Sequence, residues 1–184
     1  METFTKFIED KIAPPLIKFS NLKYVQIIQR TFVASTGLLI VGSIFLLLAS
    51  LPIEGYQNLI GDFSSKFAAV SGVGTSFIGI YVAITAAYAT VEYYNKKGEK
   101  NDYVASILLA VASFFIMVPA QTVNTVVEGS AETGKFSGVP TDFLGSKGVF
   151  AALIVAIITV ELYRFLVKKN LVIHLPEGVP AMVS

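Results

Sequence analysis

The chain has 184 residues, of which 54% are hydrophobic and only 15% are charged, and its mean hydropathy is +0.68. An average soluble domain carries about 25% charged residues, so this composition excludes an ordinary soluble protein and favours a membrane protein. With no cysteine, the chain also has no disulfide, no cysteine-ligated metal site and no cysteine nucleophile.

Residues 1–30 are predicted to form a cytoplasmic amphipathic segment. Apolar side chains at helical spacing share one face of its first part, and acidic and lysine side chains lie elsewhere. Pro14 and Pro15 should end or kink this helix, and a second amphipathic piece follows from Leu22 to Arg30. Such a segment either lies in the lipid headgroup region or packs on the cytoplasmic ends of the membrane spans, and its pattern fits both placements.

Four apolar stretches follow, each long enough to cross a membrane, because about 20 helical residues span the hydrocarbon core. The predicted spans are 31–53, 67–91, 103–127 and 148–167. Their apolar residues do not alternate with polar ones, so no strand is predicted. The expected fold class is all-α integral membrane, with a four-span scaffold over 31–168 and amphipathic interfacial helices at the N- and C-terminal ends.

The distribution of basic residues predicts the orientation of these spans. Eleven of the fourteen Lys and Arg residues precede the first span, separate the second from the third, or follow the fourth. Loops rich in Lys and Arg stay cytoplasmic, so both termini should be cytoplasmic and the loop 128–147 should face outside. Glycine, serine, threonine and proline in that loop indicate an irregular connection. Residues 169–184 should form a cytoplasmic connector to a missing C-terminal half.

Small residues recur at four-residue intervals along the second predicted span. The members of this stripe are Gly72, Ser76, Gly79, Ala83 and Ala87. Small residues at this spacing allow helix backbones to approach closely, so we expect this span to be a central one. Its contacts are either within the chain or across a subunit interface.

Two pairs of polar residues in the apolar stretches are candidate functional residues. Gln121 and Asn124 follow Pro119, where they either line a solute path beside a broken helix or mark the end of the helix at the outer interface. Glu161 and Arg164 lie three positions apart on one helical face, so they form either a structural ion pair or part of a transport mechanism.

No motif of catalysis, cofactor binding or metal binding stands out. The single histidine, His174, has no acid, base or ligand near it in sequence, so we expect a solvated side chain. The chain lacks a phosphate-binding glycine loop and an HExxH pair. No basic face interleaves with aromatic residues, so a nucleic-acid partner is not expected.

Three stretches carry a resemblance to a known family: KIAPPLIKF at 11–19, TDFLGSKGVFAALIVAI at 141–157, and VELYRFLVKKNLVIHLPEGVPAMVS at 160–184. The sequence resembles the N-terminal part of the enzyme IIC membrane component of the lactose/cellobiose/diacetylchitobiose group of sugar phosphotransferase systems. The last stretch is the most specific of the three. The resemblance covers the whole chain, whereas family members are more than twice as long.

This resemblance implies a permease in the bacterial plasma membrane that takes up a β-linked disaccharide. The sugar is phosphorylated by a partner enzyme IIB, which is charged by enzyme IIA with phosphoenolpyruvate as the source. Sugar-contacting residues of the family lie in its later half, so no catalytic or substrate-binding residue is expected in this chain. The chain should then be a scaffold and dimerisation part. The alternative is a small four-span protein in the lipid bilayer with a purely structural or interaction role.

Overall fold

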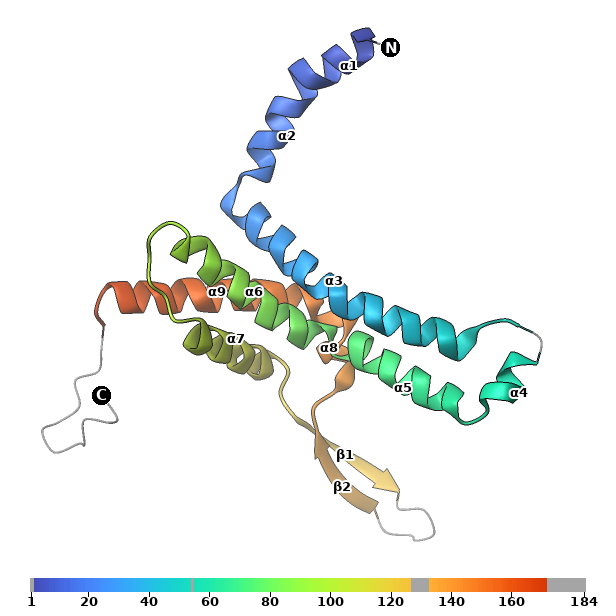
Figure 1. Ribbon diagram of the computed structural model, residues 1–184. Coiled ribbons are helices and arrows are strands. Elements are labelled where there is room, and N and C mark those ends of the chain that lie inside the picture. Colours follow the sequence, from blue (N-terminus) through green and yellow to red (C-terminus); the bar gives the residue numbers. More distant parts are fainter. Residues whose placement is uncertain (1, 54, 127–132, 172–184) are drawn as a thin grey trace, which may run out of the picture.

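The apolar stretches form helices that lie alongside one another in the computed structural model (Figure 1). The structure describes residues 2–53, 55–126 and 133–171. In chain order the helices are α1 (Glu2–Phe7), the π-helix η1 (Ile8–Ile12), α2 (Ala13–Ser20), α3 (Lys23–Ser50), α4 (Tyr56–Ile60), α5 (Phe63–Ser76), α6 (Ile78–Asn95), α7 (Tyr103–Met117), α8 (Thr141–Leu144), the 3-10 helix η2 (Ser146–Gly148) and α9 (Val149–Lys168).

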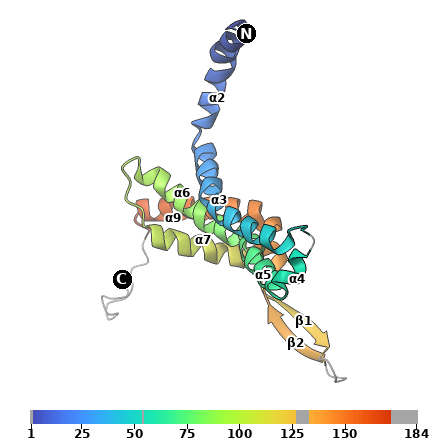
Figure 2. The ribbon, with the colours of Figure 1, turned by 45° about the vertical axis from the view of Figure 1, so that its right-hand side comes forward.

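The N-terminal helices α1, η1 and α2 form an arm that projects away from the other helices (Figures 1 and 2). Pro14 and Pro15 lie in the first turn of α2, where a missing N–H costs no helical hydrogen bond. The described residues of α2 are not buried, and apolar Leu16 and Ile17 are 57% and 59% exposed. The structure therefore does not pack the arm on the bundle, and its placement on a lipid surface stays a prediction.

The first span begins earlier than the sequence predicts. α3 is one helix of 28 residues, so the amphipathic piece expected at Leu22–Arg30 is its first two turns and not a separate segment. No proline or glycine interrupts the chain there, and the cations of that piece find carboxylates on other helices. At 1.5 Å per residue α3 is about 42 Å long, which exceeds the roughly 30 Å of a hydrocarbon core.

The second predicted span is a bent pair of helices. α5 and α6 meet at Phe77 with an angle of 44° between them. A Cβ atom on Gly79 would lie 2.7 Å from the carbonyl oxygen of Leu144, so the α8 segment presses against the start of α6. Hydropathy runs evenly through this region and does not predict the bend, at which Leu144 and Gly145 lie against the ends of α5 and α6.

The third predicted span is wrong in its second half. α7 ends at Met117, and the following residues form strand β1 (Gln121–Val126), which pairs antiparallel with β2 (Thr133–Gly138). Pro119 cannot continue the helix, and β-branched residues after it suit a strand. The expectation of no strand and of a wholly irregular 128–147 loop is corrected by this hairpin, which projects beyond the helices (Figure 1).

The core lies between α6, α7 and α9. α6 is central to it: Ala83, Ala86 and Ala87 are fully buried, and Ala152 and Ala156 of α9 are buried as well. Alanine at these positions lets the backbones of α6 and α9 come close together. α3 packs on α5 and α6 from the other side.

Two described helical segments are long and apolar enough to cross a membrane, Lys23–Ser50 and Ser146–Lys168, and the bent α5–α6 pair makes a third if it counts as one span. α7 has only 15 residues. The prediction of an apolar, helical membrane fold is confirmed, while the number of four spans stays a prediction.

Candidate functional site

Glu161 and Arg164 belong to a group of charged and aromatic side chains at the end of the bundle where α3 begins and α6 ends. Glu161 Oε1 accepts hydrogen bonds from Lys23 Nζ at 2.8 Å and from the Tyr94 hydroxyl at 2.6 Å. Lys23 Nζ also donates to the Tyr94 hydroxyl at 3.0 Å. Together with Glu99, these residues form what we term the polar cluster, and it joins α3, α6 and α9.

Arg164 makes its strongest contacts with a loop residue. Its Nε and Nη2 both donate to the carboxylate of Glu99 at 2.5 Å, in a bidentate arrangement. Its guanidinium also lies over the ring of Tyr94, 3.7 Å from the centroid. The predicted Glu161–Arg164 ion pair exists only as a longer contact of 3.6 Å between Oε2 and Nη1. Each residue of the predicted pair therefore has its main partner on another element.

The electrostatic environment of Glu99 follows from these contacts. The hydrogen bonds from Arg164 and the positive charges of Arg164 and Lys168 lower the pKa of Glu99 from 4.5 to about 2, against a smaller opposing effect of burial. Glu99 is therefore ionised at neutral pH. The side chains of Glu99 and Arg164 are 26% and 20% exposed, so water screens their interaction only in part.

Sequence reasoning missed three members of the polar cluster: Lys23, Tyr94 and Glu99. Their partners lie 65 to 138 positions away along the chain, so no local spacing reveals them. The predicted topology does indicate that the regions containing these residues lie near one another. It assigned the region before the first span, the loop after the second and the end of the fourth to the same side of the membrane.

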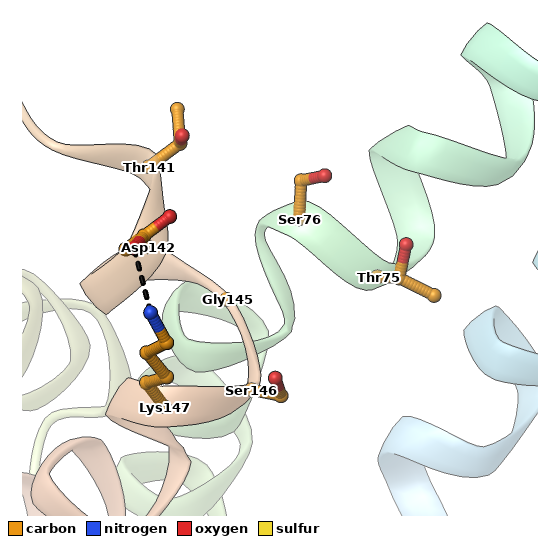
Figure 3. Close-up of a pocket in the computed structure, with 7 residues that line it drawn as sticks. All are labelled: Thr75, Ser76, Thr141, Asp142, Gly145, Ser146 and Lys147. Atoms are coloured by element: carbon orange, nitrogen blue, oxygen red, sulfur yellow. Dashed lines mark hydrogen bonds and ion pairs between the residues drawn. The ribbon is translucent and has the colours of Figure 1, made fainter.

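A second candidate site is a polar pocket of about 270 Å³ beside the bend between α5 and α6 (Figure 3). Thr75 and Ser76 form one side of it, and Asp142 and Lys147 lie on the opposite side (Figure 3). Lys147 Nζ donates to Asp142 Oδ2 at 2.7 Å, which lowers the pKa of Asp142. Hydroxyl groups both donate and accept hydrogen bonds, so this pocket can hold a polar ligand or ordered water.

The candidate residues after Pro119, Gln121 and Asn124, lie neither in the polar cluster nor in the polar pocket. Gln121 is exposed on β1 opposite Gly138, and Asn124 pairs with Lys135 in the strand register. The helix ends before both of them, which favours the second of the two alternatives raised by the sequence.

The predicted stripe of small residues divides between two environments. Gly79, Ala83 and Ala87 are buried on α6. A Cβ atom on Gly72 would meet only the Ser76 hydroxyl, at 3.9 Å, so no other described element covers this part of α5. Ser76 lines the polar pocket.

The close contact between α3 and α5 uses two glycines that the sequence did not single out. A Cβ atom on Gly74 would lie 3.7 Å from the Cα of Gly42 and 3.5 Å from the carbonyl oxygen of Leu38. A Cβ atom at this crossing would therefore make ordinary van der Waals contact with the facing backbone, so the two helices pack closely there.

Among residues 2–53, 55–126 and 133–171, no group of three or more His, Asp or Glu side chains could hold a metal ion. His174 lies outside these residues.

Comparisons with known proteins agree on one family. The family model described as "Phosphotransferase system, EIIC" matches residues 29–184. The cellobiose-specific EIIC component of Geobacillus stearothermophilus is 34% identical over 190 residues, which covers all of this chain and 41% of that protein. The lactose-specific EIICB component of Streptococcus mutans is 30% identical over 194 residues and is covered to 31%.

A solved structure gives the same result in three dimensions. The crystal structure of the transporter ChbC, the IIC component from an N,N'-diacetylchitobiose-specific phosphotransferase system, superposes with a TM-score of 0.76 at 31% sequence identity. The match covers 96% of this chain and 41% of that chain. The chain thus spans less than half the length of these relatives.

Proposed function

Because the chain belongs to the phosphotransferase system EIIC family, we propose that it is the N-terminal scaffold part of a IIC sugar permease. The permease would take up a β-linked disaccharide of the cellobiose, diacetylchitobiose or lactose type. The observation that carries this proposal is the superposition on ChbC across 96% of the chain at 31% identity. Relatives named for cellobiose and lactose support the same class of sugar.

The proposed permease works with the soluble components of its system. Enzyme IIA charges enzyme IIB, and IIB phosphorylates the sugar that the permease delivers. The fused EIICB architecture named for a lactose-specific relative supports a IIB partner at the cytoplasmic face. The polar cluster lies at the end of the bundle that we assign to the cytoplasm, where its ion pairs hold α3, α6 and α9 in a fixed arrangement.

The membrane arrangement that we propose has four spans in the bacterial plasma membrane with both termini cytoplasmic. The α5–α6 pair counts as one bent span, and α7 forms a short one. The positive charges gathered at Lys23, Arg164 and Lys168 support a cytoplasmic location for that end of the bundle. The arm of α1 and α2 would lie along the headgroup region with its exposed apolar side chains toward lipid.

We also propose that the permease is a homodimer and that α5 contributes to its interface. Gly72 is a small, partly exposed residue of α5, and a Cβ atom added to it would meet no other described helix within 4 Å. Small residues on an open helix face are typical of close helix–helix contacts in membranes. The polar pocket beside Ser76 would lie near this interface.

The proposal is tested by transport in cells that lack their own β-disaccharide permease. This chain, joined at Ser184 to the later part of the Geobacillus stearothermophilus cellobiose relative, should restore accumulation of phosphorylated cellobiose, whereas the chain alone should not. The intact relative serves as the positive control. A chimera that reaches the membrane but takes up none of the three sugars would contradict the proposed function.

A further inference from the structure

A groove of about 400 Å³ lies between α3 and α6, close to the end where α3 enters the bundle. Ala34 of α3 and Ala89 of α6 face it, and their small side chains leave this space open between the two helices. Val33 and Tyr88, which are 74% and 47% exposed, line it as well. These four side chains are carbon-rich and suit an apolar chain, whereas the remaining lining residues, Gln29, Arg30, Thr85 and Glu92, are polar or charged.

The polar group of Thr85 is occupied by the protein itself. Its hydroxyl lies 3.2 Å from the hydroxyl of Ser35 and donates to the carbonyl oxygen of Tyr81 at 2.8 Å. A ligand in the groove would therefore not need to satisfy it.

Positive charge exceeds negative charge at one end of the groove, where Arg30 and Glu92 line it and Lys96 lies one helical turn beyond Glu92. Arg30 Nη1 donates to Glu92 Oε2, and Lys96 Nζ lies 2.6 Å from Glu92 Oε1, so two cations share one carboxylate. The side chains of Arg30 and Lys96 remain 41% and 57% exposed. Guanidinium and ammonium groups have five and three N–H donors, so donors are left for a further anion.

The position of Arg30 along α3 matches the level of a lipid headgroup. Twenty residues separate Arg30 from the end of α3 at Ser50, which is about 30 Å of helix and equals the thickness of a hydrocarbon core. If Ser50 lies at one boundary of the core, Arg30 lies at the other, at the level of the lipid phosphates. Val33 and Ala34 then lie among the acyl chains.

We propose that this α3–α6 groove binds one anionic phospholipid. Its phosphate lies on Arg30 and Lys96, and an acyl chain follows Val33 and Ala34. Basic pockets between membrane helices on the cytoplasmic side are known to select anionic headgroups, whereas a zwitterionic headgroup brings a cation that Arg30 and Lys96 repel. The proposal rests on the membrane insertion proposed above. It does not depend on which sugar is transported or on whether the permease is a dimer.

The natural absence of tryptophan makes the groove accessible to a fluorescence test. In a Val33→Trp variant the introduced indole is the only one in the chain, and it lies at the wall of the groove. The variant is reconstituted in vesicles of phosphatidylcholine that contain either brominated phosphatidylglycerol or brominated phosphatidylcholine, and quenching of the indole is measured. A Leu108→Trp variant serves as the control, because Leu108 is 64% exposed on α7 and lies outside the groove.

The expected result is that brominated phosphatidylglycerol occupies the site beside the Val33→Trp indole about fivefold more strongly than brominated phosphatidylcholine, the effect of one net cation near a headgroup. The Leu108→Trp indole should be quenched equally by both lipids. Adding Arg30→Gln to the Val33→Trp variant should abolish the preference for brominated phosphatidylglycerol. Adding Lys66→Gln instead removes the same charge from an exposed site outside the groove and should leave that preference unchanged. Soluble glycerol phosphate should not displace the lipid, because it lacks the acyl chain.

Three outcomes would overturn the lipid site. They are equal quenching by both lipids at the groove, a preference that survives Arg30→Gln, and an indole at the groove that neither lipid quenches because protein covers it. In each of these the control indole is still quenched. Failure of membrane insertion is distinguishable, since it would leave the control indole unquenched as well.

Discussion

Glu99 is the loop residue that neutralises Arg164, and its replacement tests how much the polar cluster contributes to stability. Glu99→Gln keeps the shape of the side chain but removes the charge that Arg164 contacts through two nitrogens. Since the pair is only partly buried, we expect a loss of about 1–2 kcal/mol in the free energy of unfolding. Titration of the purified chain from mild detergent into SDS, followed by circular dichroism, measures it.

Asp142→Asn is the matched control for this experiment. It removes a carboxylate from an ion pair whose two side chains are both 67% exposed, so the unfolding midpoint should not move. Equal destabilisation by both substitutions would show that the polar cluster has no special role.

The lowered pKa of Glu99 predicts a pH dependence with a definite sign. Its pKa falls from 4.5 to about 2 in the folded chain, so its contribution to stability is complete above pH 4.5 and declines as the pH falls toward 2. The difference in unfolding free energy between the native chain and Glu99→Gln should therefore shrink across this range. The same SDS titration at several pH values measures this difference, and a difference that stays constant down to pH 2 would contradict the assignment.

At the scale of elements, the contact between α8 and the start of α6 is the tightest backbone approach beside the bend of the α5–α6 pair. A methyl group at Gly79 would come within 2.7 Å of the Leu144 carbonyl oxygen, which is backbone and cannot rotate away. Gly79→Ala should therefore destabilise the chain by about 1–3 kcal/mol in the SDS titration, despite the better helix propensity of alanine.

Gly72→Ala provides the comparison, because the added methyl group meets only the Ser76 hydroxyl at 3.9 Å. This substitution should leave stability unchanged or raise it slightly. If Gly72→Ala and Gly79→Ala behaved alike, the contact with α8 would not control the packing of α6.

Sequence patterns predict the elements of this fold better than their ends. Long apolar runs predict α3, α6 and α9, because burial in lipid demands continuous apolar helices. They do not show that α7 stops at Met117, since the residues from Val118 to Val127 carry no charge either. The strand that replaces the expected helix depends on pairing with β2, and a hydropathy profile contains no information about that pairing.

At the scale of the whole molecule, the orientation of the bundle can be tested with single cysteines, because the natural chain has none. Ser137→Cys on the hairpin should react with a membrane-impermeant maleimide added outside intact cells, and Lys100→Cys should react only after the membrane is opened. Lys100 is preferable to its neighbour Gly98, whose φ of +93° favours glycine. The reverse labelling pattern would overturn the proposed topology.

There is a physical reason why the sequence alone does not predict the polar cluster. Its members come from four separate parts of the chain, and their distances depend on how α3, α6 and α9 pack against each other. Hydropathy predicts that these helices exist but not which faces meet. Glu161 and Arg164 were recognisable as costly residues in a span, whereas their partners Lys23 and Glu99 resembled ordinary loop charges.

The polar cluster also has a consequence for the order of assembly during synthesis. α9 leaves the ribosome last among the described helices, and two charges within its apolar stretch, Glu161 and Arg164, raise the free energy of its transfer into lipid. Their counterions lie on α3 and on the loop after α6, which are made earlier. The last helix therefore enters the bilayer at lower cost once its predecessors have already assembled, so insertion and tertiary packing of this chain are coupled steps.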